Sequence, residues 1–172
     1  KANISIILPH TIQITLTRYP VIANIIDEIQ NSNGPNILKK FIVNSNGMII
    51  QKNNENPDLP YIRIISDKSF NLGGSPLDKK TLDYTVKLIN LFEGKFGINV
   101  TEALILKKAR EIHLTTEKNF TVWFDSSQNM NTQINKLKRA LVKLDIYNTP
   151  LEYIDLRIEG VDSDKVIFKP RK

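Results

Sequence analysis

The chain has 172 residues, of which 41% are hydrophobic and 24% charged, a balance that predicts a folded domain with a core and excludes an intrinsically disordered chain. It has no cysteines, which excludes disulfides, thiolate metal sites and Cys nucleophiles, and no run approaches the roughly 20 apolar residues that span a bilayer. The net charge of +6 is typical of a solvated lysine-rich surface, with attraction to an anionic membrane, polymer or nucleic acid as the alternative.

The first segment, ISIILPHTIQITLT, predicts two strands. Apolar and polar residues alternate with a period of two on both sides of Pro9-His10, where the pattern breaks. Pro20 ends the second strand or places it at a sheet edge. The alternating apolar positions are Ile4, Ile6, Ile12, Ile14 and Leu16.

Polar loops, a hairpin and another strand are predicted next. Residues 27–36, DEIQNSNGPN, predict a polar loop, in which Pro35 suits the first turn of a short helix. In FIVNSNGMII two apolar runs flank Asn46-Gly47, which supplies the positive φ that a tight hairpin needs. After the polar loop KNNENPD, LPYIRIIS is a further strand candidate, and NLGGSP is a connector.

The second half of the chain predicts two helices with three strands between them. Apolar residues recur at helical spacing in both helices, and Gly94 is a stop signal for the first. Because these helices interrupt strands that are mostly linked by hairpins, we predict an α+β fold with the helices on one face of a sheet. The predicted ranges are helix 78–93, strands 98–106, 110–116 and 119–124, and helix 131–145.

The second helix has a basic side. Its cations usually indicate a solvated face, and the alternative is a track for phosphate groups. The residues expected to face outward are Lys136, Arg139 and Lys143, opposite the apolar Ile134, Leu137, Leu141 and Leu144.

The sequence contains no motif for catalysis or for cofactor binding. It has no Walker loop, Rossmann glycine pattern or nucleophile elbow, and Gly73-Gly74 is too short to cradle a phosphate. The histidines, His10 and His113, lack ligand spacing. We therefore predict no enzyme activity, no cofactor and no metal site. We expect His113 on the polar face of a strand, and Trp123 in the core or on the second face of the sheet, with a binding role as the alternative.

The closing stretch, YIDLRIEGVDSDKVIF, contains two alternating segments around a turn at 160–164. One interpretation is a terminal hairpin whose Asp155–Arg157 ion pair contributes about 0–1 kcal/mol. The other is a sheet edge that accepts a strand from a partner, with Tyr and Arg as interface anchors. In the first segment, the residues expected on the open face are Tyr153, Asp155, Arg157 and Glu159, opposite Ile154, Leu156 and Ile158; in the second, Val166 and Phe168 lie opposite Ile167.

YIDLR, placed near the C-terminus after an amphipathic helix, resembles the ending of the FtsQ/DivIB family of bacterial cell-division proteins. ISIILPHTIQITLTRYPVIA is similar to that family's two strands, with a Pro between them and a Pro before an Ala. FIVNSNGMII and LPYI resemble its hairpin and the Leu-Pro that follows, and the first helix and KKAREIHLTT lie where the family places them. The resemblance covers nearly the whole chain and depends on the order and spacing of these motifs.

The resemblance implies a fragment of a larger protein. Family members have a cytoplasmic tail, one transmembrane helix, a POTRA domain and an outer β domain. Residues 1–25 would be the C-terminal strands of the POTRA-like domain. Residues 26–172 would be the β domain, a bent, largely antiparallel sheet with two main helices on one face. The protein would then be single-pass in the plasma (inner) membrane, with this part on the extracytoplasmic side at the division septum.

The family also implies a function and a site. It is a non-enzymatic scaffold of the divisome that binds FtsB/DivIC-like and FtsL-like proteins and helps control septal peptidoglycan synthesis. Its FtsB-type partner adds a short strand at the last strands of the β domain, where Arg157 would pair with a partner carboxylate and Phe168 would be an aromatic anchor. Neither nucleic acid nor a small-molecule substrate is expected. The implied contacts are Tyr153, Arg157, Ile158, Val166, Ile167, Phe168 and Arg110.

Several features depart from the family pattern: Thr17-Arg18 stands where the family commonly has Glu before its Pro, PVIA is one residue longer than the usual PVA, and residues 27–36 resemble an insertion. Two more lie in the closing stretch. Ile158 stands where some members have an aromatic residue, and the turn at 160–164 is acidic through Asp162 and Asp164, which disfavours acidic partners. The alternative class of function is a basic α+β module that binds nucleic acid or an anionic polymer through the 131–145 helix. A steep fall of affinity with salt would favour that alternative.

Overall fold

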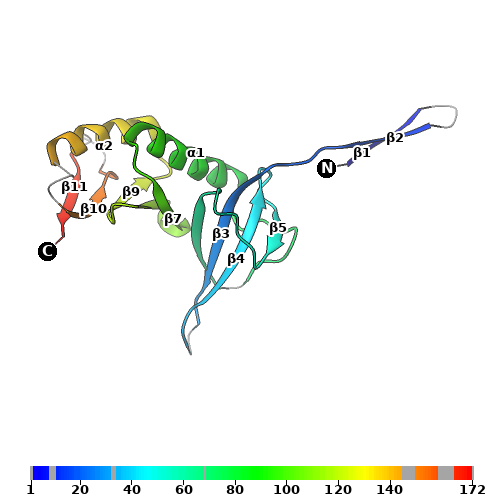
Figure 1. Ribbon diagram of the computed structural model, residues 1–172, viewed down its shortest axis with the longest axis horizontal. Helices are drawn as coiled ribbons and strands as arrows, with labels where there is room; N and C mark the ends of the chain where they lie inside the picture. Colours follow the sequence, from blue (N-terminus) through cyan, green and yellow to red (C-terminus); the bar gives the residue numbers. More distant parts are fainter. Residues whose placement is uncertain are drawn as a thin grey trace.

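A computed structural model of the protein describes residues 2–7, 11–31, 34–67, 69–144, 150–158 and 165–171. Within these ranges the chain forms a nine-stranded sheet, a separate two-stranded sheet and two α-helices (Figure 1). No helix in the described ranges has the length and apolar content needed to cross a membrane.

The large sheet is mixed. Its strand order is β11-β10-β9-β8-β7-β6-β3-β4-β5, and five of the eight neighbouring pairs are antiparallel while three are parallel. This confirms the predicted α+β class. The strands are β3 (Val21–Ile29), β4 (Ile37–Asn44), β5 (Ile49–Lys52), β6 (Tyr61–Ser66), β7 (Val100–Leu106), β8 (Glu111–Thr116), β9 (Thr121–Asp125), β10 (Leu151–Asp155) and β11 (Ile167–Pro170).

Both helices cover the same face of this sheet because each connects two parallel neighbours. Helix α1 (Lys79–Phe96) links β6 to β7, and α2 (Met130–Leu144) links β9 to β10. The two crossovers advance in the same direction along the sheet, and such crossovers almost always have one handedness. The helices therefore lie on one side (Figure 1), and the other face, here called the open face, has no helix over it.

Helix α1 ends later than the sequence predicts. Its N-cap Asp78 accepts a hydrogen bond from the backbone N–H of Thr81 at 2.8 Å, and it ends at Gly97, whose φ is 61°. The predicted stop at Gly94 is wrong, because Phe96 extends the apolar side of the helix and packs on Phe92 with ring centroids 5.1 Å apart. That packing offsets the cost of a glycine inside a helix, about 1 kcal/mol.

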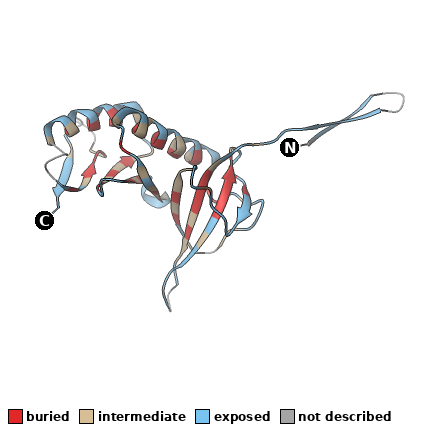
Figure 2. Cartoon of the chain, in the orientation of Figure 1, coloured by how far each residue is buried: buried red, intermediate tan, exposed pale blue. Residues whose placement is uncertain are grey.

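The core lies between the helices and the sheet. Buried residues run along the inner sides of the strands and of both helices (Figure 2). The central strands alternate buried and half-buried positions, as in β8 and β9. Half-burial of the open-face residues therefore comes from neighbouring side chains on that face.

The loop predicted at 27–36 is wrong for its first three residues, 27–29, which belong to strand β3. Asp27 is fully buried within the strand, and Ile29 pairs with Ile37 of β4. No helix follows Pro35, because β4 begins at residue 37. Strand β3 has β4 on one side and β6 on the other, so its ladder hydrogen bonds override the polar composition from which a loop was predicted.

The two hairpin turns predicted from local sequence signals are confirmed. The predicted hairpin of FIVNSNGMII is β4–β5, and Gly47 has a φ of 79°. The predicted hairpin at 117–119 joins β8 to β9, and Asn119 has a φ of 61°. Both turns use residues that adopt the left-handed region at low cost.

The two-stranded sheet is the predicted N-terminal strand pair, β1 (Ala2–Ile7) and β2 (Thr11–Leu16). It projects away from the rest of the chain (Figure 1) and is exposed along its length (Figure 2). The register places Ile4 opposite Ile14 and Ile6 opposite Ile12, so these side chains share one face. All four are more than half exposed, at 59–74%. The predicted break at Pro9-His10 lies outside the described residues.

Candidate functional site at the C-terminal edge of the sheet

Strand β11 forms one edge of the large sheet, and β10 does not. Strand β10 pairs in parallel with β9 and antiparallel with β11, so its backbone has partners on both sides. Within the described ranges, no strand or loop backbone bonds to the outer side of β11. The open backbone groups predicted for the closing stretch therefore belong to β11, while Tyr153 lies one strand inside.

The side chains of β11 present apolar groups on both faces. Phe168 pairs with the buried Ile154, which places it on the helix side, and Ile167 pairs with Asp155, which places it on the open face. Ile167 is 50% exposed and Phe168 is 44% exposed. Val166 is half-buried and packs against the core. The edge thus combines unpaired backbone with exposed apolar side chains.

Arg157 is held by two carboxylates on the open face. Its Nε and Nη2 donate to the two oxygens of Asp155 at 2.8 and 2.7 Å, and its Nη1 contacts Glu111 of β8. Burial acts to raise the pKa of Asp155, but the hydrogen bonds and charge of Arg157 outweigh it, so that pKa is lowered. The sequence predicted the Asp155–Arg157 pair, and the structure adds Glu111 to it.

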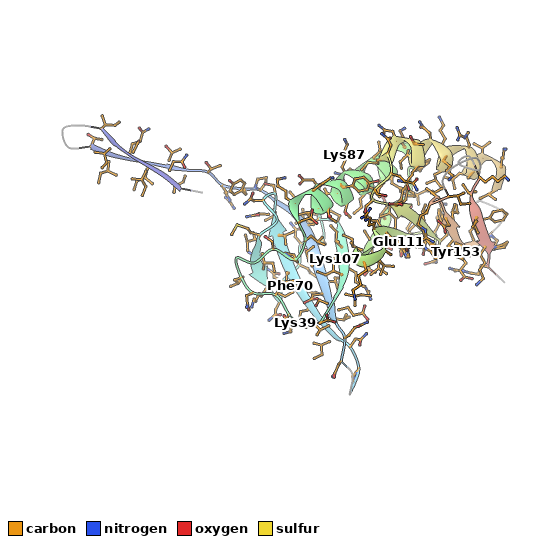
Figure 3. All side chains as sticks on the ribbon, turned by 180° about the vertical axis from the view of Figure 1, so that it is seen from behind. Lys39, Phe70, Lys87, Lys107, Glu111 and Tyr153 are labelled. Carbon is orange, nitrogen blue, oxygen red and sulfur yellow. The ribbon has the colours of Figure 1, made fainter. Side chains whose placement is uncertain are left out.

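An aromatic stack crosses three strands beside Arg157. The ring of Trp123 lies between His113 and Tyr153, with centroids 4.7 and 4.4 Å away and interplanar angles of 13° and 8°. The Arg157 guanidinium carbon lies 5.0 Å from the Trp123 ring centroid, a cation–π distance. Figure 3 shows Glu111 and Tyr153 on the side of the sheet away from the helices. His113 lies on the polar face of its strand, as predicted, and of the two places predicted for Trp123 the structure shows the second face and not the core.

Residues 111, 113, 123, 153, 155 and 157 are called the open-face cluster below. Its carboxylates exceed its arginine by one, and His113 does not compensate because burial lowers its pKa despite its 2.9 Å contact with Glu111. The stack is assembled from β8, β9 and β10, which pair directly. The cluster is therefore a rigid, slightly acidic support behind the β11 edge.

Lys136 faces inward, which contradicts the prediction that it lies on the outer side of α2. Its residue is 3% exposed, and its Nζ donates to the backbone carbonyls of Leu156 and Ile158, both at 2.9 Å. Arg139 and Lys143 are exposed, as predicted. The position fits because Gln133 and Ala140, three residues before and four residues after Lys136 on the same side of the helix, are also buried.

Arg110 comes directly before β8 and is not on the C-terminal strands with the other predicted contacts. It has a φ of 57°, and its carbonyl accepts hydrogen bonds from the N–H and hydroxyl of Ser126 at 2.8 and 2.9 Å. Its side chain lines a groove with Asp78 and Thr81 at the start of α1. The other six predicted residues lie on or next to β10 and β11, while Arg110 directly precedes Glu111, which lines the same groove and contacts Arg157.

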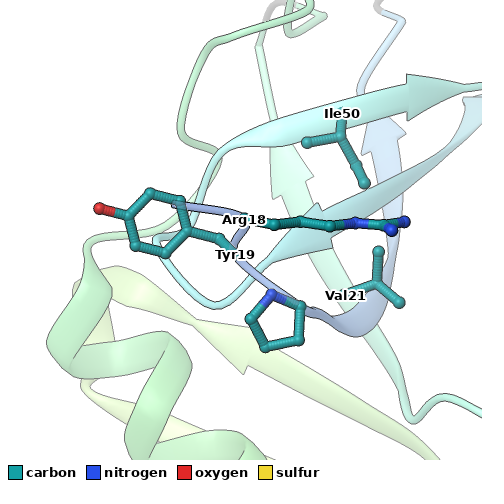
Figure 4. A pocket seen from close by; sticks show the side chains of 5 residues that line it. Arg18, Tyr19, Val21 and Ile50 are labelled. Atoms are coloured by element: carbon teal, nitrogen blue, oxygen red, sulfur yellow. The ribbon is translucent and has the colours of Figure 1, made fainter. Parts of the chain in front are cut away.

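A second hollow lies where the β1–β2 hairpin joins the large sheet. Figure 4 shows Arg18 and Tyr19 near Val21 and Ile50, the residues that line it with Pro20. It contains no carboxylate, and no group of three or more His, Asp or Glu side chains in the described ranges could hold a metal ion.

The predicted acidic turn with Asp162 and Asp164 lies outside the described residues.

Comparison with models of protein families gives a match over residues 35–157, more than half of the chain. The matched description is "Cell division protein FtsQ/DivIB, C-terminal". A comparison with curated proteins gives no match. The matched range begins just before β4 and ends at Arg157, so it includes the open-face cluster.

Proposed function

The chain belongs to the FtsQ/DivIB family of cell-division proteins, and from this premise we propose that it is a non-enzymatic scaffold of the division septum. It binds FtsB/DivIC-like and FtsL-like partners through its C-terminal strands and so helps control septal peptidoglycan synthesis. The observation that carries this proposal is the outer edge of β11, which has no backbone partner among the residues that the structure describes.

A short partner strand would complete this edge. Added strands gain affinity from main-chain hydrogen bonds and specificity from alternate side chains. Here the alternate side chains would meet Phe168 and Val166 on the helix side and Ile167 on the open face. Strand β11 is only four residues long and ends in Lys169-Pro170, features that limit unspecific pairing at an edge. The edge thus favours one short, matched segment.

Arg157 keeps donors for the partner. Asp155 and Glu111 engage three of the five N–H groups of a guanidinium, and the side chain is 27% exposed. A partner carboxylate or carbonyl oxygen can accept from the other two. Because the cluster already holds one carboxylate more than it needs to neutralise Arg157, a single acidic side chain is the most that it would accept.

We further propose the domain division implied by the resemblance. The strands β1 and β2 are the last strands of a POTRA-like domain, and the large sheet with its helices is the β domain, held on the extracytoplasmic side by a membrane anchor. The boundary predicted between residues 25 and 26 moves to a point before β3, because β3 pairs with β4 from Val21 onward. The exposed apolar face of β1–β2 supports this division, since a two-stranded hairpin with such a face needs a covering layer. The basic-helix alternative is weaker because Lys136 is turned inward.

The test measures binding of the cognate FtsB- or DivIC-type protein by calorimetry. Phe168→Ala removes an exposed aromatic anchor, and we expect affinity to fall about tenfold or more. Leu72→Ala is the matched control, because Leu72 is 59% exposed near the opposite edge of the sheet. Equal affinities of the two folded variants would overturn the assigned surface. If binding weakens steeply with rising salt concentration and is unchanged by the substitution in β11, the alternative of nucleic-acid or polyanion binding is favoured.

A further inference from the structure

The segment 156–158 leaves the sheet and is held by side chains. Strand β10 ends at Asp155, and the last backbone link to β9 is the N–H of Leu156, which donates to the carbonyl of Trp123 at 3.1 Å. Beyond that point no strand among the residues that the structure describes bonds to the backbone of this segment. Its backbone carbonyls must then find donors elsewhere or be left unsatisfied.

Each carbonyl of this segment accepts from α2 or from the loop before it. Lys136 donates to Leu156 and Ile158, and Gln128 Nε2 donates to Arg157 at 3.1 Å. The ammonium of Lys136 is buried and bridges two carbonyls that are two residues apart. One side chain therefore fixes both the position and the direction in which the chain leaves β10.

This geometry places Arg157 on the open face. With the carbonyls of residues 156 and 158 drawn toward α2, the side chain between them lies beside Asp155 and the Trp123 ring. After leaving β10 through the segment 156–158, the chain returns as β11, which pairs with β10 from Asp155 to Leu151. The docking edge and the cluster behind it thus share one anchor.

We propose that Lys136 is the positioning residue of the C-terminal edge: it sets Arg157 and β11 for partner binding without touching the partner. The inference rests on the proposed function for its biological meaning, while the positioning itself is a property of the free chain. It assigns a role to the one cation of α2 that does not serve as solvated surface.

The test compares three variants of the chain. Lys136→Met keeps the length of the side chain and removes its donors. Gln128→Ala removes the single donor to the same segment from a loop, where little packing is lost. Lys138→Met is the matched control, the same substitution two residues along on the exposed side of α2.

The main readout is amide hydrogen exchange by segment in the free protein. Hydrogen bonds from a charged donor contribute about 1.5–3 kcal/mol, so we expect Lys136→Met to speed exchange about tenfold or more in 151–158 and 165–171. Gln128→Ala should change the same segments in the same direction and by less, and Lys138→Met should not change them. Exchange in β7 to β9 should stay as in the wild type, and Trp123, the sole tryptophan, should report the displaced Arg157 by its emission.

The outcomes separate the positioning from the proposed function. If Lys136→Met exchanges like Lys138→Met, or if β7 to β9 lose protection equally, Lys136 has no positioning role. If Lys136→Met does not fold, Gln128→Ala decides by whether its effect is confined to the two segments. With the cognate FtsB- or DivIC-type protein, affinity should fall in the same order as protection. A wild-type chain that does not bind this protein would overturn the proposed function, while the exchange pattern would still support the positioning.

Discussion

The two edges of the large sheet are built differently. At β5 the chain covers its own edge, because Ile49 donates to the carbonyl of Gly74 at 2.8 Å and accepts from the N–H of Gly73 at 2.9 Å. At β11 no such loop lies alongside among the described residues. Natural sheets usually cover or blunt their edges, so an edge left open beside a rigid polar cluster is the one suited to a partner. The contrast supports our proposal that β11, and not β5, is the site of recognition.

The largest expected effect comes from breaking the support behind β11. Arg157→Glu places a third carboxylate beside Asp155 and Glu111, and we expect the free energy of unfolding to fall by roughly 3–5 kcal/mol. Chemical denaturation at pH 7 measures this, and part of the loss should return at low pH as carboxylates are protonated.

Lys169→Glu is the control for that change. Lys169 lies on β11 itself and pairs with Glu152 at 2.8 Å, but both side chains are about half exposed, at 51% and 47%. Reversing this charge should lower the free energy of unfolding far less than Arg157→Glu does, because solvent screens an exposed pair. Similar losses in the two variants would mean that the open-face cluster does not support the edge.

A smaller effect tests the charge of Asp155. Its pKa in the folded chain lies below its usual 3.8, because the bonds and charge from Arg157 outweigh the burial that opposes them. Such a group stabilises the fold above pH 3.8, and the contribution is lost as the pH falls through the folded pKa. Asp155→Asn should lower the stability at pH 7 by about 1–3 kcal/mol and flatten the loss on acidification. If denaturation curves show that Asp155→Asn and the wild type lose the same stability on acidification, this prediction is contradicted.

The smallest effect is expected in the other half of the sheet, at Asp27. Burial raises the pKa of Asp27 above 3.8, against the hydrogen bond from Ser66 and the charges of Lys39 and Lys107. The pH dependence is therefore opposite to that of Asp155. The contribution of Asp27 to the stability is complete below pH 3.8 and is lost as the pH rises through the folded pKa. Its Oδ2 is buried without a hydrogen bond. Asp27→Asn should therefore raise the stability at pH 7 by about 1 kcal/mol, and thermal unfolding that shows a loss would refute this.

The two halves also differ in how far the sequence predicts them. Local periodicity and turn residues predicted both helices, the β4–β5 and β8–β9 hairpins and the N-terminal pair. They missed β3 because Asn24 and Asp27 interrupt its apolar pattern. Those polar groups are tolerated through contacts distant in sequence: Asn24 Nδ2 donates to the carbonyls of Asn56 and Leu59 at 2.7 and 2.9 Å, and Ser66 donates to Asp27. Such long-range partners leave no local signal.

The site shows the same limit. Asp155, Arg157 and the apolar residues of β11 could be proposed from one stretch, since they are neighbours in sequence. Glu111, His113 and Trp123 join them only because β8, β9 and β10 lie side by side. Lys136 was placed on the wrong side of α2, because a lysine is usually solvated and nothing local shows that two carbonyls need its ammonium.

The central claim is that the unpaired edge of β11 takes up a partner strand. The most direct measurement is amide hydrogen exchange of the chain, alone and with its cognate FtsB- or DivIC-type protein, resolved by segment. We expect new protection at residues 167–170 and none at Ile49, where Gly73 and Gly74 already cover the edge. Protection at β5 or along α2, with β11 unchanged by a saturating partner, would contradict the claim.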